Sequence, residues 1–387
     1  MPLDSPATDA LVRLLPQFKE TTGISVNVVA LSYENLYSEV LKEDVSSKYD
    51  LIRIDMAWLA ELAKKIFMPL DKDIECYKEI SSSFLTALGQ DYTSLCGIPY
   101  AFPFDPSVQI FFYNQDAFEN SRMKRLYYEM YKKELEIPSD YADYDRISRF
   151  FTKRYNNNSV MEYGTALTFG TPGVASCDFM PRIMDSLDDS VTFETDAIEK
   201  ALEDYVKTRD CTDGSVNIWW KDTIGKFISG SVSMITVFMN HASQIANSKY
   251  SKVVGKVGCS LVPGHHPLLG GGSIGISKNT KEKDAAFEFL RWVFSDEIST
   301  LYTMLGGISP RASVYNKPEI LSMYPWLRVA EESFRCGTRS FTNVNVANHQ
   351  IEVEHVLGEA VRSASMYSSK PKEAIHSAEE KLKDILK

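Results

Sequence analysis

Apolar and polar residues alternate with two different periods in the amino-terminal part of the chain. A helical period runs from about Asp9 to Thr21 and stops at Gly23. Two runs rich in β-branched residues predict strands at Ser25–Leu31 and Asp50–Asp55, and helical patterns follow them at Tyr33–Lys42 and Met56–Ile66. Strands that alternate with helices at this spacing predict an α/β fold with a parallel sheet covered on both faces.

A stretch rich in proline and aromatic residues separates this part from the rest of the chain. Pro99, Pro103 and Pro106 hold residues 97–106 in extended or turn conformations, because proline fixes φ and biases its predecessor away from the helix. The mostly apolar run 107–114 then predicts a strand buried on both faces. We interpret it as the strand by which the chain leaves one lobe and enters another.

Further helices and strands are predicted beyond Asn114. Helical patterns cover 123–136, 144–156, 195–207 and 223–230, and strand patterns cover 163–171, 231–239, 255–262 and 273–277. After the last of these strands, Asn279 is the predicted N-cap of a helix and Glu282 its capping-box partner.

Length and charge narrow the class of protein. At 387 residues the chain exceeds the size at which a single core stops growing, so we expect two lobes. The net charge, 42 minus 52 or −10, argues against nucleic acid or an anionic membrane as the main partner. No apolar run approaches the length of a membrane span, and residues 1–4 lack the basic and apolar regions of a signal peptide.

The cysteines and histidines suggest neither a metal nor a cofactor. No C-x-x-C pair occurs, and no histidine stands at zinc-ligand spacing from a cysteine. We interpret the cysteines as six free thiols, which are uncommon outside the cell. They are Cys76, Cys96, Cys177, Cys211, Cys259 and Cys336. The pair His265-His266 lies among proline and glycine and is interpreted as a solvated loop.

A glycine run at 270–275 matches two enzyme signatures without their structural context. Residues 271–275 fit G-x-S-x-G around Ser273, and 270–275 fit G-x-G-x-x-G. Both motifs need a strand before the glycines and a helix directly after them, whereas here the predicted strand comes after. The run is therefore interpreted as backbone that can approach a ligand closely, or as a flexible passage between lobes.

Aromatic side chains stand where a ligand site is expected. In α/β sheets ligands bind beyond the carboxyl ends of the strands, where this sequence has Tyr33, Asp55 and Trp58. The adjacent Trp219 and Trp220 lie in a polar stretch, so at least one of them is expected to line the site. The alternatives are an N-cap role for Asp55 and a core role for Trp58.

Short motifs occur in a characteristic order along the chain. They are 22–26 (TGISV), 49–52 (YDLI), 97–100 (GIPY), 112–114 (FYN), 227–234 (FISGSVSM), 271–289 and 307–311 (GISPR). Their order and spacing resemble the bacterial extracellular solute-binding proteins of family one. These are the sugar receptors of ABC transporters, related to maltose-binding protein.

The resemblance implies a two-lobe periplasmic-binding-protein fold of type II, with three crossings in the hinge and a ligand cleft between the lobes. Lobe one would comprise 1–112 plus 271–318, and lobe two 113–270 plus 319–387. The function implied is capture of a small ligand, a mono- or oligosaccharide, by hinge closure, and its delivery to the membrane permease of an ABC importer. No catalysis, no cofactor, no direct nucleic-acid contact and a monomer are expected.

The resemblance also implies which residues bind the ligand. Aromatic rings would stack on sugar faces, and polar groups would bind hydroxyls. The expected ligand-binding residues are Tyr33, Asp55, Trp58, Phe104, Asp105, Phe169, Trp219, Trp220, Asn240, Gly272, Ser273 and Arg311.

Two alternatives stay open. The first strand of the family should precede the first helix, and only Met1 to Leu3 could belong to it, so the chain is expected to be cut at or just inside its start. With the free thiols, this allows a cytoplasmic ligand-sensing domain of a transcriptional regulator instead of a receptor that is lipid-anchored or periplasmic. A remote alternative is a serine esterase that uses Ser273 and His241.

Overall fold

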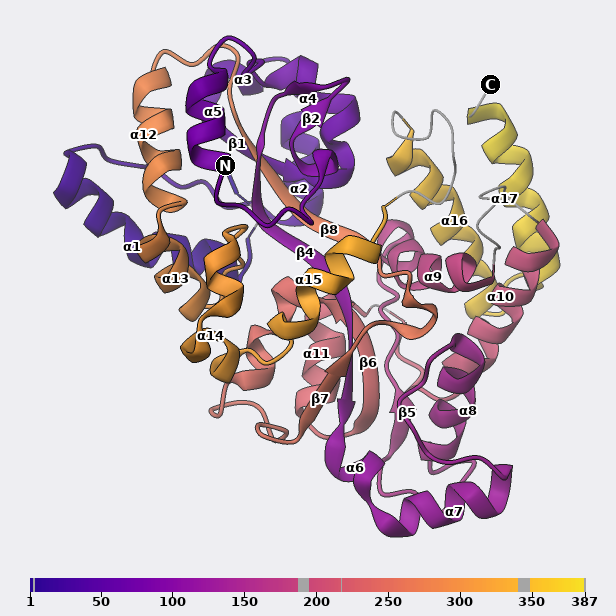
Figure 1. Ribbon diagram of the computed structural model, residues 1–387. Coiled ribbons are helices and arrows are strands. Elements are labelled where there is room, and N and C mark those ends of the chain that lie inside the picture. Colours follow the sequence, from indigo (N-terminus) through magenta and orange to yellow (C-terminus); the bar gives the residue numbers. More distant parts are fainter. Residues whose placement is uncertain (3, 187–194, 217, 340–348, 386–387) are drawn as a thin grey trace. The chain divides into compact units, whose positions relative to one another are not determined.

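The computed structural model describes the chain except residues 3, 187–194, 217, 340–348 and 386–387 (Figure 1). Leu3, named above in connection with the first strand, therefore lies outside the described residues. The chain divides into two compact units, each built from two segments. Unit 1 comprises Met1–Val108 and Gly270–Arg335, and unit 2 comprises Gln109–Leu269 and Cys336–Lys387. The chain thus passes between the units three times.

Residues 319–335, which the sequence analysis assigned to lobe two, belong to unit 1. Their side chains explain why. The Tyr324 hydroxyl donates to the Met304 carbonyl at 3.2 Å, and the Phe334 ring packs edge-on against Tyr92 with 6.5 Å between centroids. Both partners belong to unit 1.

Unit 1 places helices around a short antiparallel pair of strands (Figure 1). Its first segment contains α1 (Pro6–Thr22), α2 (Tyr33–Val40), α3 (Val45–Lys48), β1 (Leu51–Asp55), η1 (Met56–Trp58), α4 (Leu59–Ile66), α5 (Ile74–Ser81), η2 (Gln90–Tyr92), β2 (Ser94–Leu95) and β3 (Ile98–Pro99). Its second segment contains α12 (Lys283–Val293), α13 (Asp296–Met304), η5 (Ala312–Asn316), α14 (Pro318–Met323) and α15 (Leu327–Cys336), which ends at the last passage. Strand β8 (Leu269–Ile276) pairs antiparallel with β1.

The described residues do not form the all-parallel sheet expected at the amino-terminal end. Met1 bonds β1 in the parallel pattern, through its amino group to the Leu51 carbonyl and through its carbonyl to the Arg53 N–H, but the strand on the other side of β1 is antiparallel. β1 pairs with the antiparallel β8, with Leu51 opposite Ile276 and Asp55 opposite Gly272. The segment 25–30 is not a strand, although its composition favours one. No backbone hydrogen bond joins it to any other described residue, and a strand exists only where a neighbour supplies those bonds.

Strand β4 (Phe102–Asn114) is longer than predicted, since it includes two of the three prolines. All but one of its residues are buried. Asp105 within it has a positive φ of 54°, and its carboxylate accepts from the Ile308 N–H at 3.1 Å. β4 and β8 are the strands that carry the chain through the first two passages between the units.

Unit 2 contains a mixed sheet and a group of packed helices. β4 pairs antiparallel with β6 (Val232–Phe238) and β7 (Val257–Ser260), and β5 (Tyr163–Thr165) pairs parallel with β6. The remaining elements are α6 (Gln115–Glu119), α7 (Ser121–Tyr131), α8 (Tyr141–Phe151), α9 (Pro172–Ser186), α10 (Thr195–Arg209), α11 (Trp220–Ile228), η3 (Met239–Ala246), η4 (Pro263–His265), α16 (Gln350–Ser365) and α17 (Pro371–Ile385). Helices α9, α10, α16 and α17 pack on one another (Figure 1).

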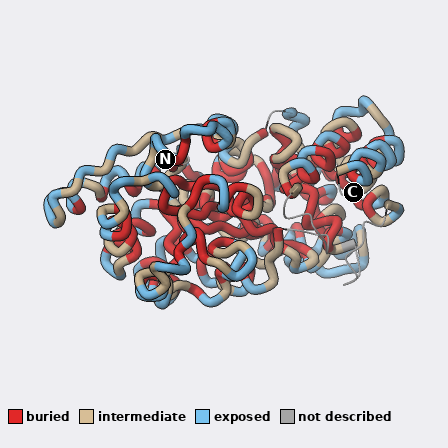
Figure 2. The backbone as a smooth tube through the Cα atoms, turned by 90° about the horizontal axis from the view of Figure 1, so that it is seen from above, coloured by how far each residue is buried: buried red, intermediate tan, exposed pale blue. Residues whose placement is uncertain are grey.

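Each unit has its own hydrophobic core. In unit 1 the stripe of α1, with Leu11 and Phe18, packs against Phe289 and Leu290 of α12. In unit 2 the core runs between α9, α10, α16 and α17. Figure 2 shows buried and exposed positions alternating along the helices, as one apolar stripe per helix requires.

Two local details complete the fold. The predicted cap of α12 is wrong: the helix begins at Lys283, its N-cap residue is Glu282, and no side chain caps it. The Asn279 amide instead donates to the Ser46 hydroxyl at 2.8 Å, which ties the loop before α12 to α3. No helix in the described parts of the chain is both long and apolar enough to cross a membrane.

Candidate functional site

Three aromatic rings gather near the carboxyl end of β1 in unit 1. Tyr33 and Tyr37 lie one turn apart on α2, and both rings pack on Trp58, with centroids 5.1 and 4.8 Å away. Trp58 is 2% exposed, whereas both tyrosines are half-buried. The accessible surface of this unit 1 cluster (Tyr33, Tyr37 and Trp58) therefore belongs to the tyrosines, and Trp58 supports them from below.

Asp55 joins the unit 1 cluster to the sheet. It is the last residue of β1, and its Oδ1 accepts from the Ala57 N–H at 2.9 Å. Asp55 is therefore the N-cap of η1, the short helix that carries Trp58. Gly272 lies opposite Asp55 in the β1–β8 pair. A Cβ on Gly272 would lie 2.0 Å from Arg53 Nε, so a larger residue at this position would require the Arg53 side chain to move.

The other expected residues of unit 1 are held by contacts within that unit, Phe104 and Ser273 in its interior and Arg311 at a partly exposed position. Phe104 is 3% exposed and packs on Tyr302, with 5.9 Å between centroids. The buried Ser273 hydroxyl donates to the Tyr92 carbonyl at 2.7 Å. Arg311 Nη1 donates to Ser83 Oγ and to the Phe294 carbonyl, both at 2.8 Å, and its Nε bonds Asp296. These contacts, like that of Asp105 with Ile308, give each residue a packing role.

A second aromatic group lies at the start of α11 in unit 2. The Trp219 and Trp220 rings meet edge-on at 5.8 Å, and Trp220 stacks on His241 at 5.4 Å with an interplanar angle of 10°. The Trp219 N–H donates to the Asp222 carboxylate at 3.0 Å, which fixes the first turn of α11. Both tryptophans are half-buried, so this unit 2 cluster (Trp219, Trp220 and His241) has rings that a ligand can reach.

Phe169 and Asn240 adjoin the unit 2 cluster, Phe169 through a backbone hydrogen bond and Asn240 as the residue before His241. The Phe169 N–H donates to the Ile218 carbonyl at 2.8 Å, and a Cβ on the next residue, Gly170, would lie 3.0 Å from Trp219 Nε1. The Phe169 ring itself is buried below the guanidinium group of Arg362, 5.3 Å from its centroid. Asn240 is buried and directly precedes His241 in η3.

Sequence reasoning missed two members of these clusters. Tyr37 stands four residues after Tyr33 on the same helix, a spacing that brings two side chains together and could have indicated it. His241 was considered only as a catalytic base, yet it offers a flat ring to Trp220. The strand pattern that ends at residue 239 places it just beyond β6.

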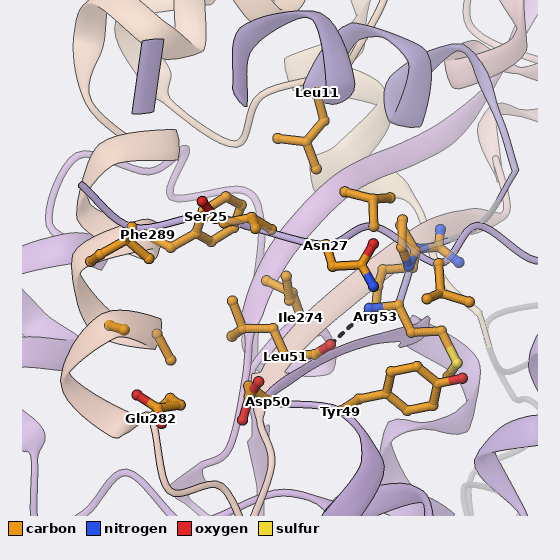
Figure 3. Close-up of a pocket in the computed structure, with 18 of the residues that line it drawn as sticks. Leu11, Ser25, Asn27, Tyr49, Asp50, Leu51, Arg53, Ile274, Glu282 and Phe289 are labelled. Atoms are coloured by element: carbon orange, nitrogen blue, oxygen red, sulfur yellow. Dashed lines mark hydrogen bonds between the residues drawn. The ribbon is translucent and has the colours of Figure 1, made fainter. Parts of the chain in front are cut away.

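Unit 1 also contains a pocket of about 700 Å³ that shares only Phe104 with the expected ligand-binding residues. Its lining includes Leu11 of α1, Ile274 of β8 and Phe289 of α12 (Figure 3). Among the described residues, no group of three or more His, Cys, Asp and Glu side chains could hold a metal ion. Cys76, Cys96 and Cys211 are free thiols.

The two-unit arrangement has close counterparts among known proteins. An ABC transporter solute-binding protein of Agrobacterium radiobacter K84, solved with ribitol, matches with a TM-score of 0.84 at 21% identity over 99% of this chain and 97% of that chain. The maltose-bound MalE3 of T. maritima matches with a TM-score of 0.79 at 20% identity, over 100% and 99% of the two chains. At such identities the likeness shows the fold: the predicted two-lobe, maltose-binding-protein-like α/β fold is confirmed.

Sequence comparisons show the family. A probable amino-acid ABC transporter periplasmic-binding protein of Sinorhizobium fredii is 22% identical over 340 residues, which cover 82% of this chain and 73% of that protein. The family model for bacterial extracellular solute-binding proteins matches residues 14–326. The family and these relatives are transport receptors that bind small molecules and work with ABC permeases. The chain therefore belongs to the bacterial extracellular solute-binding proteins of ABC transporters.

Proposed function

We propose that this receptor binds a neutral polyol or a mono- or oligosaccharide and delivers it to an ABC permease without chemical change. The observation that supports the proposal is that each unit presents one cluster of half-buried aromatic rings beside fixed polar groups. The ribitol and maltose bound by the two structural relatives belong to the same chemical class.

The chemistry of the clusters fits such a ligand. A sugar or polyol offers apolar C–H faces and a rim of hydroxyls, so its site needs flat rings for the faces and fixed polar groups for the rim. Tyr33 and Tyr37 in unit 1, and Trp219 in unit 2, supply the rings. Their own hydroxyl and indole N–H groups can also bond to ligand hydroxyls.

The two clusters are proposed to contact the same ligand from different units. A ligand that touches both units binds the closed arrangement more tightly than the open one, so binding closes the hinge. Ser273 has no catalytic role in this proposal, since its hydroxyl is buried and donates to the Tyr92 carbonyl. The receptor is proposed to act as a monomer, without contact to nucleic acid.

Thermal unfolding against a ligand panel tests the proposal. The panel contains ribitol, maltose, other neutral mono- and oligosaccharides, sugar phosphates and amino acids. A ligand that binds only the folded chain raises Tm by mass action, so a neutral sugar or polyol is expected to raise it. Removal of one ring, by Tyr33→Ala or Trp219→Ala, should weaken binding about tenfold to a hundredfold, since a buried ring contributes roughly 1.5–3 kcal/mol.

A matched control separates binding from stability. Trp292 lies on α12, where its ring packs on Phe18 with centroids 4.9 Å apart, outside both clusters. Trp292→Ala should lower Tm of the free chain and leave the ligand-induced rise intact. A ligand response confined to amino acids, or one that survives both cluster variants, would contradict the proposal.

The same ligand panel distinguishes between two cellular locations for the protein. We propose the outer face of the membrane, lipid-anchored or periplasmic, in keeping with the family. Cysteine usage favours the second candidate, a cytoplasmic sensor domain of a transcriptional regulator, because free thiols such as Cys76, Cys96 and Cys211 are uncommon outside the cell. A rise in Tm with phosphorylated sugars alone would support that candidate, because those compounds are made inside the cell.

A further inference from the structure

Tyr92 of η2 bonds β4 and β8 to each other on the unit 1 side of the first two passages. Its hydroxyl donates to the Ser107 carbonyl at 3.0 Å and to the Gly270 carbonyl at 2.8 Å, sharing one proton between them. Ser107 comes one residue before β4 leaves unit 1, and Gly270 is the first residue of β8 in that unit. Tyr92 is 1% exposed, so water does not compete for these bonds.

The third passage also contacts Tyr92. Phe334, which precedes the end of unit 1 at Arg335, packs edge-on against the Tyr92 ring. The Tyr92 carbonyl accepts from the Ser273 hydroxyl of β8, which fixes η2 to that strand. One buried side chain therefore contacts all three passages where each leaves or enters unit 1.

A glycine brings β4 and β8 together beside the Tyr92 hydroxyl. Gly271 has a φ of 83°, and a Cβ on it would lie 2.3 Å from the Asp105 carbonyl oxygen and 2.5 Å from the Ser107 nitrogen. Both are backbone atoms, so only a residue without a side chain permits this approach. The two strands are thus close enough for one hydroxyl to reach both.

The same three passages are bonded to one another within unit 2. The Gln109 N–H donates to the Leu268 carbonyl, and the Leu268 N–H donates to Gln109 Oε1, both at 3.1 Å. The Leu269 N–H donates to the Thr338 carbonyl at 2.8 Å, and Arg339 Nη1 donates to the Leu269 carbonyl at 2.9 Å.

Two of these residues are anchored to helices of unit 2. Gln109 Nε2 donates to the Cys177 carbonyl of α9 at 2.8 Å. The buried Arg339 forms an ion pair with the buried Glu354 of α16, with 2.8 Å between Nε and Oε1. On this side the passages therefore move with the helices of unit 2.

Little chain lies between the two sets of bonds. It consists of residue 108 in the first passage, the peptide bond between 269 and 270 in the second, and residues 335–337 in the third. Rotation of one unit against the other has to use these positions, because the chain on either side is bonded within a single unit.

We propose that Tyr92 is a hinge-positioning residue, which confines rotation to these positions and thereby raises the fraction of the free receptor that is ready to close on a ligand. The inference rests on the hinge closure of the proposed function and assigns a residue outside both aromatic clusters. Without the hydroxyl, the unit 1 ends of β4 and β8 move independently, and fewer arrangements of the free receptor can close. Observed affinity falls in proportion to the competent fraction.

Hydrogen exchange of the free, full chain tests the confinement without any ligand. Tyr92→Phe keeps the ring against Phe334 and removes only the hydroxyl. Exchange of the Gln109 and Leu269 N–H groups should become about two- to tenfold faster, which corresponds to the net contribution of one hydrogen bond. Both groups belong to unit 2, so a role limited to packing within unit 1 would leave them unchanged.

The matched control is Tyr324→Phe. It removes the hydroxyl of another buried tyrosine of unit 1, which donates to the Met304 carbonyl at 3.2 Å. The control should leave exchange of the Gln109 and Leu269 N–H groups at the rate of the parent chain.

Rapid-mixing kinetics with ribitol and maltose as probes test the effect on capture. Tyr92→Phe should lower the association rate constant about two- to tenfold and leave the dissociation rate constant unchanged, since the closed complex keeps its ligand contacts. Trp219→Ala removes a proposed ligand contact and should instead raise the dissociation rate constant.

Four results would overturn the proposal. They are unchanged exchange at Gln109 and Leu269, equal acceleration by Tyr324→Phe, an unchanged association rate constant, and weaker binding that comes from faster dissociation alone. If neither ribitol nor maltose binds the parent chain, the proposed function is wrong for these ligands, and the exchange measurement still decides the role of Tyr92.

Discussion

At the scale of single residues, Asp178 of α9 is a carboxylate whose environment disfavours its charge. It accepts from the Tyr205 hydroxyl at 2.8 Å and from the Thr168 N–H at 3.2 Å. Burial raises its pKa from 3.8 to about 6, against the opposing effects of these donors and of Arg182. Between these two values the folded chain binds more protons than the unfolded chain, so the free energy of unfolding falls as pH rises through this window.

Asp178→Asn should remove that pH dependence. The neutral amide keeps the size of the side chain and can still bond Tyr205 and Thr168, so above pH 6 the variant should be the more stable. The gain is at most about 1.4 kcal/mol for each unit of pKa shift, and less here because the side chain is only half-buried. Urea unfolding at several pH values measures it.

Tyr205→Phe is the companion variant. It removes the donor that lowers the pKa of Asp178, so it should move the sensitive window to higher pH. If Asp178→Asn unfolds with the same pH dependence as the parent chain, another group is responsible.

The sequence indicated that some residues of the candidate site would be accessible to a ligand, but for others it could not. Trp219 and Trp220 stood out because two adjacent large rings in a polar stretch cannot both enter a core. Ser273 and Arg311 were chosen by their place in a family motif, and the structure ties both to partners within unit 1. Whether a side chain faces solvent depends on neighbours from distant segments, which a motif does not contain.

At the scale of elements, α9 and α16 of unit 2 approach each other through Gly358. A Cβ there would lie 1.7 Å from the Pro172 carbonyl oxygen and 2.3 Å from its carbonyl carbon, both of which are backbone atoms. No side chain can rotate to make room, so any larger residue must push the two helices apart.

Gly358→Ala is therefore expected to destabilise the chain by up to about 2 kcal/mol. The usual cost of overpacking is about 1–3 kcal/mol, and the preference of a helix for alanine over glycine offsets about 1 kcal/mol of it. The control is Gly225→Ala in α11, where nothing lies within 4 Å of the added methyl group. It should leave stability unchanged or raise it slightly. If both variants change the free energy of unfolding in urea by the same amount, the close approach of α9 and α16 does not make Gly358 important for stability.

Helices with a strong periodic pattern could be predicted from the sequence. Strands could not be predicted as well, because a strand also depends on hydrogen bonds from a neighbouring segment. The helix from about Asp9 to Thr21 is α1, and the positive φ of Gly23 ends it as expected. The β-branched run 25–31 predicted a strand, yet no described neighbour supplies backbone hydrogen bonds to its residues 25–30. Composition gives a segment its propensity for a strand, but pairing depends on what lies beside it.

At the scale of the whole molecule, the fold is two units with separate cores, joined by three passages of the chain. The order of the motifs indicated this organisation. The residue at which the chain changes unit could not be read from the sequence, because β4 and β8 continue without interruption through the first two passages. A hydrophobic pattern shows where a strand runs, but it does not show to which unit each half of that strand belongs.

Small-angle X-ray scattering tests whether the two units act together on one ligand. A ligand identified by thermal unfolding, added in excess, should reduce the radius of gyration, because contact with both units favours the closed arrangement. Trp219→Ala should reduce this response at the same ligand concentration, and Tyr33→Ala should do so from the other unit. Trp292→Ala should keep it. A ligand that raises Tm but leaves the radius of gyration unchanged would instead occupy one unit alone, and the aromatic cluster whose variant abolishes the rise in Tm would identify that unit.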